Sequence, residues 1–322
     1  MNKRKLGNSN IEVSPLAFGG NVFGWTVDEP RAFELLDHFV ASGFNLIDTA
    51  DVYSRWAPSN SGGESETIIG NWMKARGNRD QVIVATKVGM EMGPGKKGLS
   101  KTYILTAVED SLLRLKTDYI DLYQSHVFDP ETPQEETLSA YADLINQGKV
   151  RAIGASNFTA EQLAEALRIS DQYSYPRYTS LQPLYNLYDR ADFETNLEPV
   201  CMQNGIGVIP YYSLASGFLT GKYRSEADLT KSPRGQGVKK YLNERGFRIL
   251  KALDHVAKKH NATPGQIALA WLMARPSITA PIASATNRKQ LDELVSATAL
   301  QLDPESIELL NQASAETSAQ TG

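Results

Sequence analysis

Asp48 and Tyr53 are the first residues of the chain whose types and spacing could do chemistry. They belong to the stretch GFNLIDTADVY, residues 43–53. The apolar run 44–47 predicts a buried strand, and Asp48 then places a charge at the carboxyl end of that strand. Tyr53 follows along a tight loop, so both side chains can reach one pocket, where a carboxylate beside a phenol can serve acid–base chemistry. A plainer alternative stays open, in which Asp48 caps the next helix and Tyr53 is a loop aromatic.

The composition is that of a globular protein. The chain has 322 residues, of which 41% are hydrophobic and 22% charged, enough for a core of one large or two ordinary domains. No stretch approaches the roughly 20 apolar residues of a membrane span, and no signal peptide is evident, so we expect a cytoplasmic protein without a membrane partner. The single cysteine, Cys201, predicts a helix-packing residue rather than a disulfide or a metal site. A net charge of −4 gives no general reason to bind nucleic acid.

Strand and helix patterns alternate along the chain. We expect strands at 14–20, 44–47, 81–86, 118–126, 150–156, 179–183, 206–211 and 278–284. We expect helices at 30–41, 64–75, 101–115, 134–147, 160–169, 193–204, 244–259, 264–274 and 289–298, with an appended helix after Pro304. Residues 3–13 predict a small hairpin about a Gly7-Asn8 turn, which would act as a lid or plug. Residues 213–243 form a long connection rich in glycine, and a loop of this length is usually functional.

The eight strands decide the fold class. Nearly all of them lack polar alternation, which predicts a parallel sheet covered by helices, and their number favours a (β/α)₈ TIM barrel formed by residues 1–322 as a single domain. A doubly wound sheet is the alternative. No GxGxxG motif follows the first strand, which argues against a dinucleotide-binding domain of that second type.

In a barrel the active site lies at the carboxyl ends of the strands, where this chain places further polar residues. Taken singly, Lys87 could be a solvated loop lysine and His126 a structural histidine. Taken together with Tyr53 they form a coherent set, because a buried Lys87 ammonium would stabilise the Tyr53 phenolate and lower its pKa. Asp48 could hold that ammonium, and a neutral His126 could donate a hydrogen bond to a substrate carbonyl oxygen. The set therefore suits carbonyl reduction.

The chain resembles the aldo-keto reductases, which are NAD(P)H-dependent (β/α)₈ oxidoreductases. The resemblance covers nearly the whole length and rests on GFNLIDTADVY, the lysine of VATKVG, the His126 strand, GKVRAIGASNF, LQPLYNLYDR, IGVIPYYSLASGFLTGKY and SATNRKQLDE. It implies that Asp48, Tyr53, Lys87 and His126 form a catalytic tetrad in which Tyr53 is the general acid.

The resemblance also implies a cofactor site. Ser156, Asn157 and Gln182 would hold the nicotinamide amide, which needs both donors and acceptors, and Tyr211 would stack on the nicotinamide ring. Gly20, Asn21 and Asp48 are expected to contact the cofactor as well. The pyrophosphate would lie against Tyr212, Ser213, Leu214, Ala215, Ser216, Gly217, Lys222 and Arg234. The adenosine end would lie against Ser284, Thr286, Asn287, Arg288, Gln290 and Glu293.

Some residues depart from the family pattern. Many relatives have Trp or Tyr, then Ser, then Pro where this chain has residues 211–213, and Leu294 replaces an asparagine that contacts adenine. Residues 286 and 287 are also good N-caps, so an ordinary helix start is an alternative to an adenosine site there. Three aromatic residues could line an apolar substrate pocket or simply cap the barrel; they are Trp25, Trp56 and Phe128.

These observations predict an NADPH-dependent reductase that acts on a small aldehyde or ketone. NADP(H) is favoured over NAD(H) because Arg288 lies at a helix start, where a 2′-phosphate would bind, although Lys289 or Lys222 could supply the charge instead. One alternative is an NAD(P)⁺-dependent dehydrogenase of a sugar or polyol. Another is a cofactor-sensing regulatory subunit similar to potassium-channel β subunits. We expect no extended N-terminal segment that could act as a tether, and this expectation argues against the regulatory role. The sequence favours neither a monomer nor a homo-oligomer.

Overall fold

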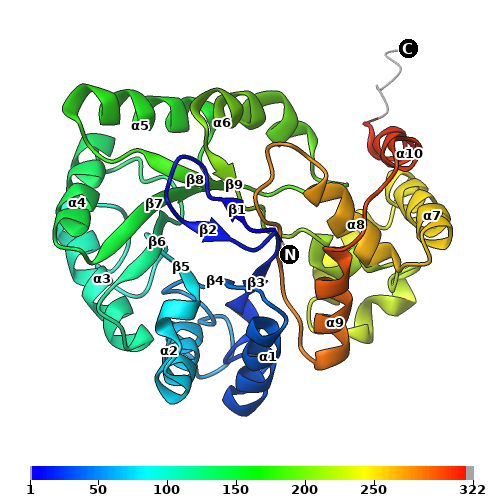
Figure 1. The fold of residues 1–322 in the computed structure, drawn as a ribbon, viewed down its shortest axis with the longest axis horizontal. Helices are drawn as coiled ribbons and strands as arrows, with labels where there is room; N and C mark the ends of the chain where they lie inside the picture. The colour runs from blue at the N-terminus through cyan, green and yellow to red at the C-terminus, as the bar shows by residue number, and fades with distance from the viewer. Residues whose placement is uncertain (1, 317–322) are drawn as a thin grey trace.

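Eight parallel strands form the centre of the computed structural model, which describes residues 2–316 (Figure 1). They are β3 (Ala17–Gly19), β4 (Leu46–Asp48), β5 (Ile83–Val88), β6 (Ile120–Ser125), β7 (Val150–Ser156), β8 (Tyr178–Gln182), β9 (Gly207–Val208) and β10 (Ile282–Ala283). The order in the sheet is β10-β3-β4-β5-β6-β7-β8-β9. Just before β10, the backbone N–H of Thr279 donates to Val208 O at 2.8 Å, and at the start of β10 that of Ile282 donates to Pro210 O at 2.9 Å. These bonds join the two edges of the sheet, and the predicted (β/α)₈ barrel is confirmed.

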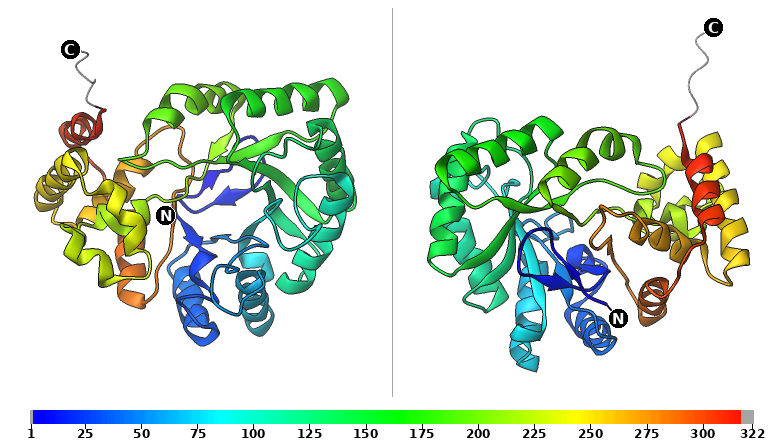
Figure 2. Two further views of the ribbon diagram at one scale, coloured as in Figure 1. Left: turned by 180° about the vertical axis from the view of Figure 1, so that it is seen from behind. Right: turned by 45° about the horizontal axis from the view of Figure 1, so that its top comes forward.

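The helices lie around the outside of the sheet (Figures 1 and 2). They are α1 (Glu29–Ala41), α2 (Glu64–Arg76), α3 (Lys101–Leu115), α4 (Gln134–Asn146), α5 (Ala160–Tyr173), α6 (Glu198–Asn204), α7 (Glu244–Lys259), α8 (Pro264–Met273), α9 (Arg288–Ala297) and α10 (Pro304–Ser314). The predicted helices are therefore present, and the appended α10 packs against α7. Cys201 is buried in α6, as expected. Within residues 2–316, no helix is both long and apolar enough to cross a membrane.

Two layers of side chains fill the structure. Large aromatic residues, including Trp72 and Trp271, are fully buried between the sheet and its helices. The barrel interior instead holds small and branched side chains, because eight strands leave little room inside. These interior residues are Ala17, Leu46, Ala85, Leu122, Ala152, Ile209, Ala280 and Ile282.

The N-terminal hairpin plugs one end of the barrel. Its strands β1 (Arg4–Lys5) and β2 (Glu12–Val13) pair antiparallel, as predicted, and the hairpin lies across the barrel centre in Figure 1. Leu6 is fully buried against the interior residues. At the turn, Gly7 has φ 53°, and a Cβ there would lie 2.1 Å from the Thr179 carbonyl oxygen, so only glycine fits. The hairpin is thus a plug at the amino ends of the strands, and it leaves the carboxyl ends open.

The long connection between β9 and α7 is ordered. It contains three short 3₁₀ helices, η4 (Ala215–Thr220), η5 (Glu226–Lys231) and η6 (Gly235–Tyr241). The sequence predicts none of them, because 3₁₀ turns are too short to show a hydrophobic period. The rings of Phe218 and Tyr241 stack with centroids 5.3 Å apart, so the loop carries a small core of its own.

Candidate active site

The side chains of Asp48, Tyr53 and Lys87 meet at the carboxyl ends of β4 and β5. Lys87 Nζ donates to both Asp48 carboxylate oxygens at 2.8 Å and to the Tyr53 hydroxyl at 3.0 Å. It also donates to the Thr49 backbone carbonyl at 2.7 Å. Lys87 is fully buried, so this set of acceptors compensates the ammonium for the loss of water. The structure therefore brings together three of the four predicted tetrad residues by direct hydrogen bonds.

The register of two strands explains why these side chains meet. Asp48 is paired with Ala85 in the parallel ladder of β4 and β5. Side chains alternate between the two faces of a strand, so Lys87, two residues beyond Ala85, points to the same side. Tyr53 returns to this point from the loop after β4, where its backbone N–H donates to Ala50 O at 3.2 Å.

Burial decides the protonation of the Tyr53 phenol. Burial raises the pKa of Tyr53 and the Lys87 ammonium offsets only part of this, so the pKa lies above its ordinary value. The Lys87 ammonium does lower the pKa of Tyr53, as expected, but burial outweighs this contribution. Burial lowers the pKa of Lys87, but Asp48 and Tyr53 raise it by more. The net pKa of Lys87 therefore lies above its ordinary value, and the ammonium remains charged. A protonated phenol on a charged ammonium is a suitable proton donor.

His126 completes the group from the carboxyl end of β6. Its ring centroid lies 6.0 Å from that of Tyr53, in an edge-on arrangement. Burial, and to a lesser degree the Lys87 charge, holds the pKa of His126 well below its ordinary value, so the imidazole is neutral. Its Nδ1 has no hydrogen-bond partner among residues 2–316. A neutral imidazole that faces a phenol can donate a hydrogen bond to a carbonyl oxygen placed between them.

Polar residues expected at the nicotinamide lie beside the tetrad in one hydrogen-bonded set. Gln182 Nε2 donates to Asp48 Oδ1 at 2.8 Å, and Ser156 Oγ donates to the Gln182 backbone carbonyl at 2.8 Å. The Tyr211 hydroxyl donates to Asn157 Oδ1 at 2.7 Å. Ends of β7, β8 and β9 thus meet at one place, and the Gln182 amide connects that place to the tetrad.

The backbone after β9 forms a sharply turned cradle. Tyr212, Ala215 and Ser216 have φ values of 52°, 48° and 57°, and Gly217 follows with φ 94°. Left-handed backbone is costly for residues other than glycine and is found mainly at functional sites, where successive N–H groups can bind anions. A Cβ at Gly217 would lie 3.2 Å from Lys222 Nζ, so a cation borders the cradle.

Arg234 brings a second cation toward the barrel mouth. Its guanidinium carbon lies 5.4 Å from the centre of the Trp25 ring, which belongs to the loop after β3. Burial lowers the pKa of Arg234, and its Nη2 has no hydrogen-bond partner in the part of the chain that the structure describes. A half-buried guanidinium with a buried, unpaired Nη2 is costly unless an anionic ligand compensates it. The cradle and this guanidinium therefore fit a pyrophosphate.

The expected adenosine end lies where β10 leads into α9. Ser284 Oγ donates to Asn21 Oδ1 at 2.7 Å, which joins the loops after β10 and β3. Asn287 caps α9 by accepting from Gln290 N at 3.0 Å, so the stretch is a normal helix start, as the alternative predicted. Arg288 is exposed and forms no ion pair with the described residues. Leu294 is buried, consistent with a packing residue in place of a polar contact.

One of the three aromatic residues considered for the pocket, Trp56, packs against Tyr53, and a second, Trp25, packs against Trp56. The Trp56 ring centroid is 5.6 Å from that of Tyr53 and 5.9 Å from that of Trp25. Trp56 is 48% exposed, so this aromatic wall is open to a ligand. Phe128 instead packs edge-on against Phe158 at 5.6 Å.

Sequence reasoning missed two polar contributors to the site. The Thr49 carbonyl accepts from Lys87, but a backbone oxygen leaves no sequence signal. Gln124 Oε1 accepts from Gln182 Nε2 at 3.3 Å while the Gln124 side chain is fully buried. A glutamine near the carboxyl end of the strand, where polar residues gather in a barrel, was the available signal for it.

Comparison with known proteins agrees with this geometry. The model of the Aldo/keto reductase family matches residues 15–315. The chain is 35% identical over 303 residues to the aldo-keto reductase YhdN of Bacillus subtilis, covering 92% of this chain and 87% of that protein. It is 30% identical over 341 residues to versiconal hemiacetal acetate reductase of Aspergillus parasiticus, covering 97% and 96%. It is 33% identical over 301 residues to a probable voltage-gated potassium channel subunit beta of Arabidopsis thaliana, covering 91% and 90%.

The family match, on a (β/α)₈ barrel with polar residues at its strand ends, supports oxidoreductase activity on carbonyl groups. The chain belongs to the aldo/keto reductase family and is an NAD(P)H-dependent oxidoreductase.

Proposed function

We propose that this protein reduces aldehydes or ketones to alcohols with NADPH and that Tyr53 is its proton donor. The observation that carries the proposal is the buried Lys87 ammonium, which bonds to the Tyr53 hydroxyl at 3.0 Å and to both oxygens of Asp48 at 2.8 Å. The dinucleotide, when bound, supplies the hydride. The residues of the chain bind the carbonyl group, polarise it and deliver the proton.

The proton transfer follows from the charges at the site. As negative charge develops on the carbonyl oxygen, the Tyr53 hydroxyl gives up its proton to that oxygen. The resulting phenolate is buried, and the Lys87 ammonium stabilises it at the distance of a hydrogen bond. Asp48 keeps the ammonium charged and oriented, and the neutral His126 orients the carbonyl oxygen by a hydrogen bond. The reverse reaction, alcohol oxidation, would use the same groups in the opposite order.

Residues beside the tetrad support the assignment of the cofactor site. Asn157 and Gln182 each carry an amide with a donor and an acceptor, as a nicotinamide amide requires, and Tyr211 supplies a ring next to them. Ser156 would support the same amide, and Gly20 and Asn21 would approach the cofactor from the end of β3. At Gly20 a Cβ would lie 2.9 Å from the Asp48 carbonyl oxygen, so glycine lets the end of β3 pack closely against the end of β4.

The far end of the cofactor would follow the cradle and α9. The pyrophosphate would bind the turned backbone and the two nearby cations; the residues concerned are Tyr212, Ser213, Leu214, Ala215, Ser216, Gly217, Lys222 and Arg234. The adenosine end would bind Ser284, Thr286, Asn287, Arg288, Gln290 and Glu293. The preference for NADP(H) would come from Arg288, whose exposed guanidinium at the first turn of α9 is free of protein carboxylates among residues 2–316.

The test is turnover of NADPH against a panel of aldehydes, ketones, sugars and polyols, followed by the nicotinamide absorbance. The Tyr53→Phe variant keeps the ring and removes the proton, so we expect turnover to fall by at least about 100-fold while cofactor binding stays nearly unchanged. Tyr173→Phe, on the exposed end of α5, is the matched control and should retain full activity. Full activity of Tyr53→Phe would refute the role of Tyr53, and turnover restricted to polyol oxidation would refute the proposed reaction.

A further inference from the structure

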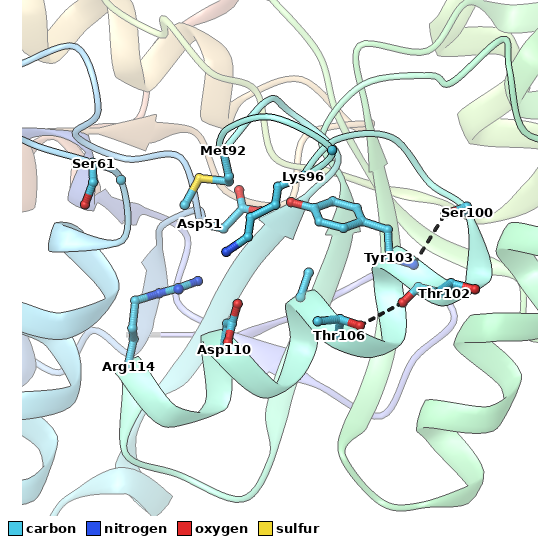
Figure 3. A pocket seen from close by; sticks show the side chains of 13 residues that line it. Asp51, Ser61, Met92, Lys96, Ser100, Thr102, Tyr103, Thr106, Asp110 and Arg114 are labelled. Atoms are coloured by element: carbon cyan, nitrogen blue, oxygen red, sulfur yellow. Dashed lines mark hydrogen bonds between the residues drawn. The ribbon is translucent and has the colours of Figure 1, made fainter.

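A cavity lies outside the barrel, between α3 and the loops after β4 and β5 (Figure 3). Its volume is about 490 Å³, the size of a site for a small molecule. Charged, aromatic and thioether side chains line it, chiefly Asp51, Met92, Lys96, Tyr103, Asp110 and Arg114. None of these residues belongs to the tetrad or to the proposed cofactor site, so the cavity is distinct from the active site.

Asp51 is the unusual member of this cavity. Its side chain is only 2% exposed, yet neither carboxyl oxygen has a hydrogen-bond partner among residues 2–316. Its backbone is fixed, since its N–H donates to the Lys87 carbonyl at 3.2 Å. A buried carboxyl without donors is costly, and proteins rarely leave one in that state without a ligand or ordered water beside it. In Figure 3 this carboxyl points into the cavity.

The charged groups around Asp51 do not compensate it. Arg114, from α3, is already engaged, because its Nε donates to Glu66 Oε2 at 2.7 Å. Lys96 and Asp110 are exposed at the rim, and neither forms an ion pair within the described part of the chain. Burial and the nearby Glu66 raise the pKa of Asp51 well above its ordinary value. Arg114, the adjacent Val52 backbone N–H and Lys87 only partly oppose this. Burial therefore favours the neutral carboxyl, and a cation beside it would favour the carboxylate.

The geometry points to a binding site for a small primary ammonium ligand, whose NH₃⁺ group donates to the Asp51 carboxylate. A short alkyl chain on the ligand would lie against Met92, Ala107 and the ring of Tyr103, and the ring face also attracts a cation. An anionic ligand fits less well, because no cation would favour ionisation of Asp51 and the Glu66 carboxylate lies behind it at the base of the cavity. Its only unpaired cationic partner among the lining residues would be the rim residue Lys96.

Calorimetric titration without cofactor tests this site with three probes of equal size: n-butylammonium, 1-butanol and butyrate. We expect saturable one-to-one binding of butylammonium with a dissociation constant on the order of 1 mM, as for ligands with very few heavy atoms. The alcohol and the carboxylate should not bind. Because binding ionises Asp51, it should release a proton, and the affinity should rise with pH until Asp51 is ionised without the ligand.

Two variants make the test specific. Asp51→Asn keeps the shape and removes the charge, so we expect the affinity to fall at least about tenfold. Thr106→Phe fills the cavity from its exposed side without touching Asp51, and it should abolish binding even if Asp51→Asn does not fold. Asp80→Asn, at an exposed position near the end of α2, is the control and should bind as the wild type does. No saturable heat from butylammonium, binding of butyrate, or unchanged affinity in Asp51→Asn and Thr106→Phe would each overturn the proposal.

Discussion

Replacing Lys87 with Met removes the charge that stabilises the Tyr53 phenolate while keeping most of the side-chain volume. At the 3.0 Å separation of Lys87 Nζ and the Tyr53 oxygen, two unit charges attract by roughly 5 kcal/mol at an effective dielectric constant of about 20. Asp48, on the other side of the ammonium, opposes part of this attraction. We therefore expect kcat to fall by a factor between about 10² and 10⁴, since each ~1.4 kcal/mol is a factor of ten.

The assay is the pH dependence of NADPH turnover with one aldehyde substrate. The Lys87 ammonium lowers the pKa of Tyr53, so its loss should raise that pKa further and move the alkaline limb of the profile to higher pH. Lys74→Met, exposed near the end of α2, is the matched control and should change neither quantity. A rate within tenfold of wild type, or an alkaline limb left in place, would refute this assignment of Lys87.

Stability separates a catalytic loss from misfolding in that experiment. Lys87→Met leaves the Asp48 carboxylate buried without its partner, which should lower the free energy of unfolding by about 3 to 5 kcal/mol. The double variant Lys87→Met with Asp48→Asn removes the unpaired charge and can still accept the Gln182 hydrogen bond. It should recover most of the stability but none of the activity.

Three further outcomes are expected. Tyr211→Ala should weaken NADPH binding by about 1 kcal/mol through loss of the ring, and a fluorescence titration equal to wild type would remove Tyr211 from the site. We expect the wild type to bind NADPH more tightly than NADH, with a preference that shrinks at high salt, and Arg288→Ala should reduce that preference. Equal affinities of the wild type for both cofactors would end that proposal. Because the folded pKa of His126 lies below its unfolded value of about 6.5, the associated stability is present above pH 6.5 and is lost as the pH falls. In urea unfolding, the free energy of unfolding should fall by up to ~1.4 kcal/mol for each pH unit below 6.5 because of this residue. The His126→Gln variant should lack that contribution.

The fold could be predicted from the sequence because its signals are local. Apolar strands without alternation and helices with caps repeat eight times, and Thr263 with Pro264 does start α8. Several strands are shorter than predicted, and two of them, β9 and β10, are limited by prolines. Pro210 follows shortly after β9 and Pro281 precedes β10, and neither can donate a ladder hydrogen bond.

Protonation and cavities could not be predicted, because they depend on packing between distant segments. Whether the pKa of Tyr53 rises or falls depends on how deeply the phenol is buried, because burial raises this pKa and the Lys87 charge lowers it. The spacing of residues in the sequence does not give the degree of burial. Asp51 looks like an ordinary loop carboxylate in the sequence. Its burial arises only when α3 and the loop after β5 pack over it. Likewise, the sequence does not show that the Gln182 amide is bonded to Asp48, although it does place Gln182 at a strand end.

The plugging hairpin has a consequence for the order in which the chain folds. It is synthesised first, but its contacts come late: Arg4 Nη1 donates to the Ile278 carbonyl at 2.9 Å across a separation of 274 residues. The Asn8 side chain donates to the Asn204 carbonyl. Closing such distant contacts is entropically slow, so the hairpin can seat only after the ribosome has released most of the barrel. Seating of the hairpin is therefore a natural last step of assembly, and a fluorophore at Asn2 should report the completion of folding rather than its start.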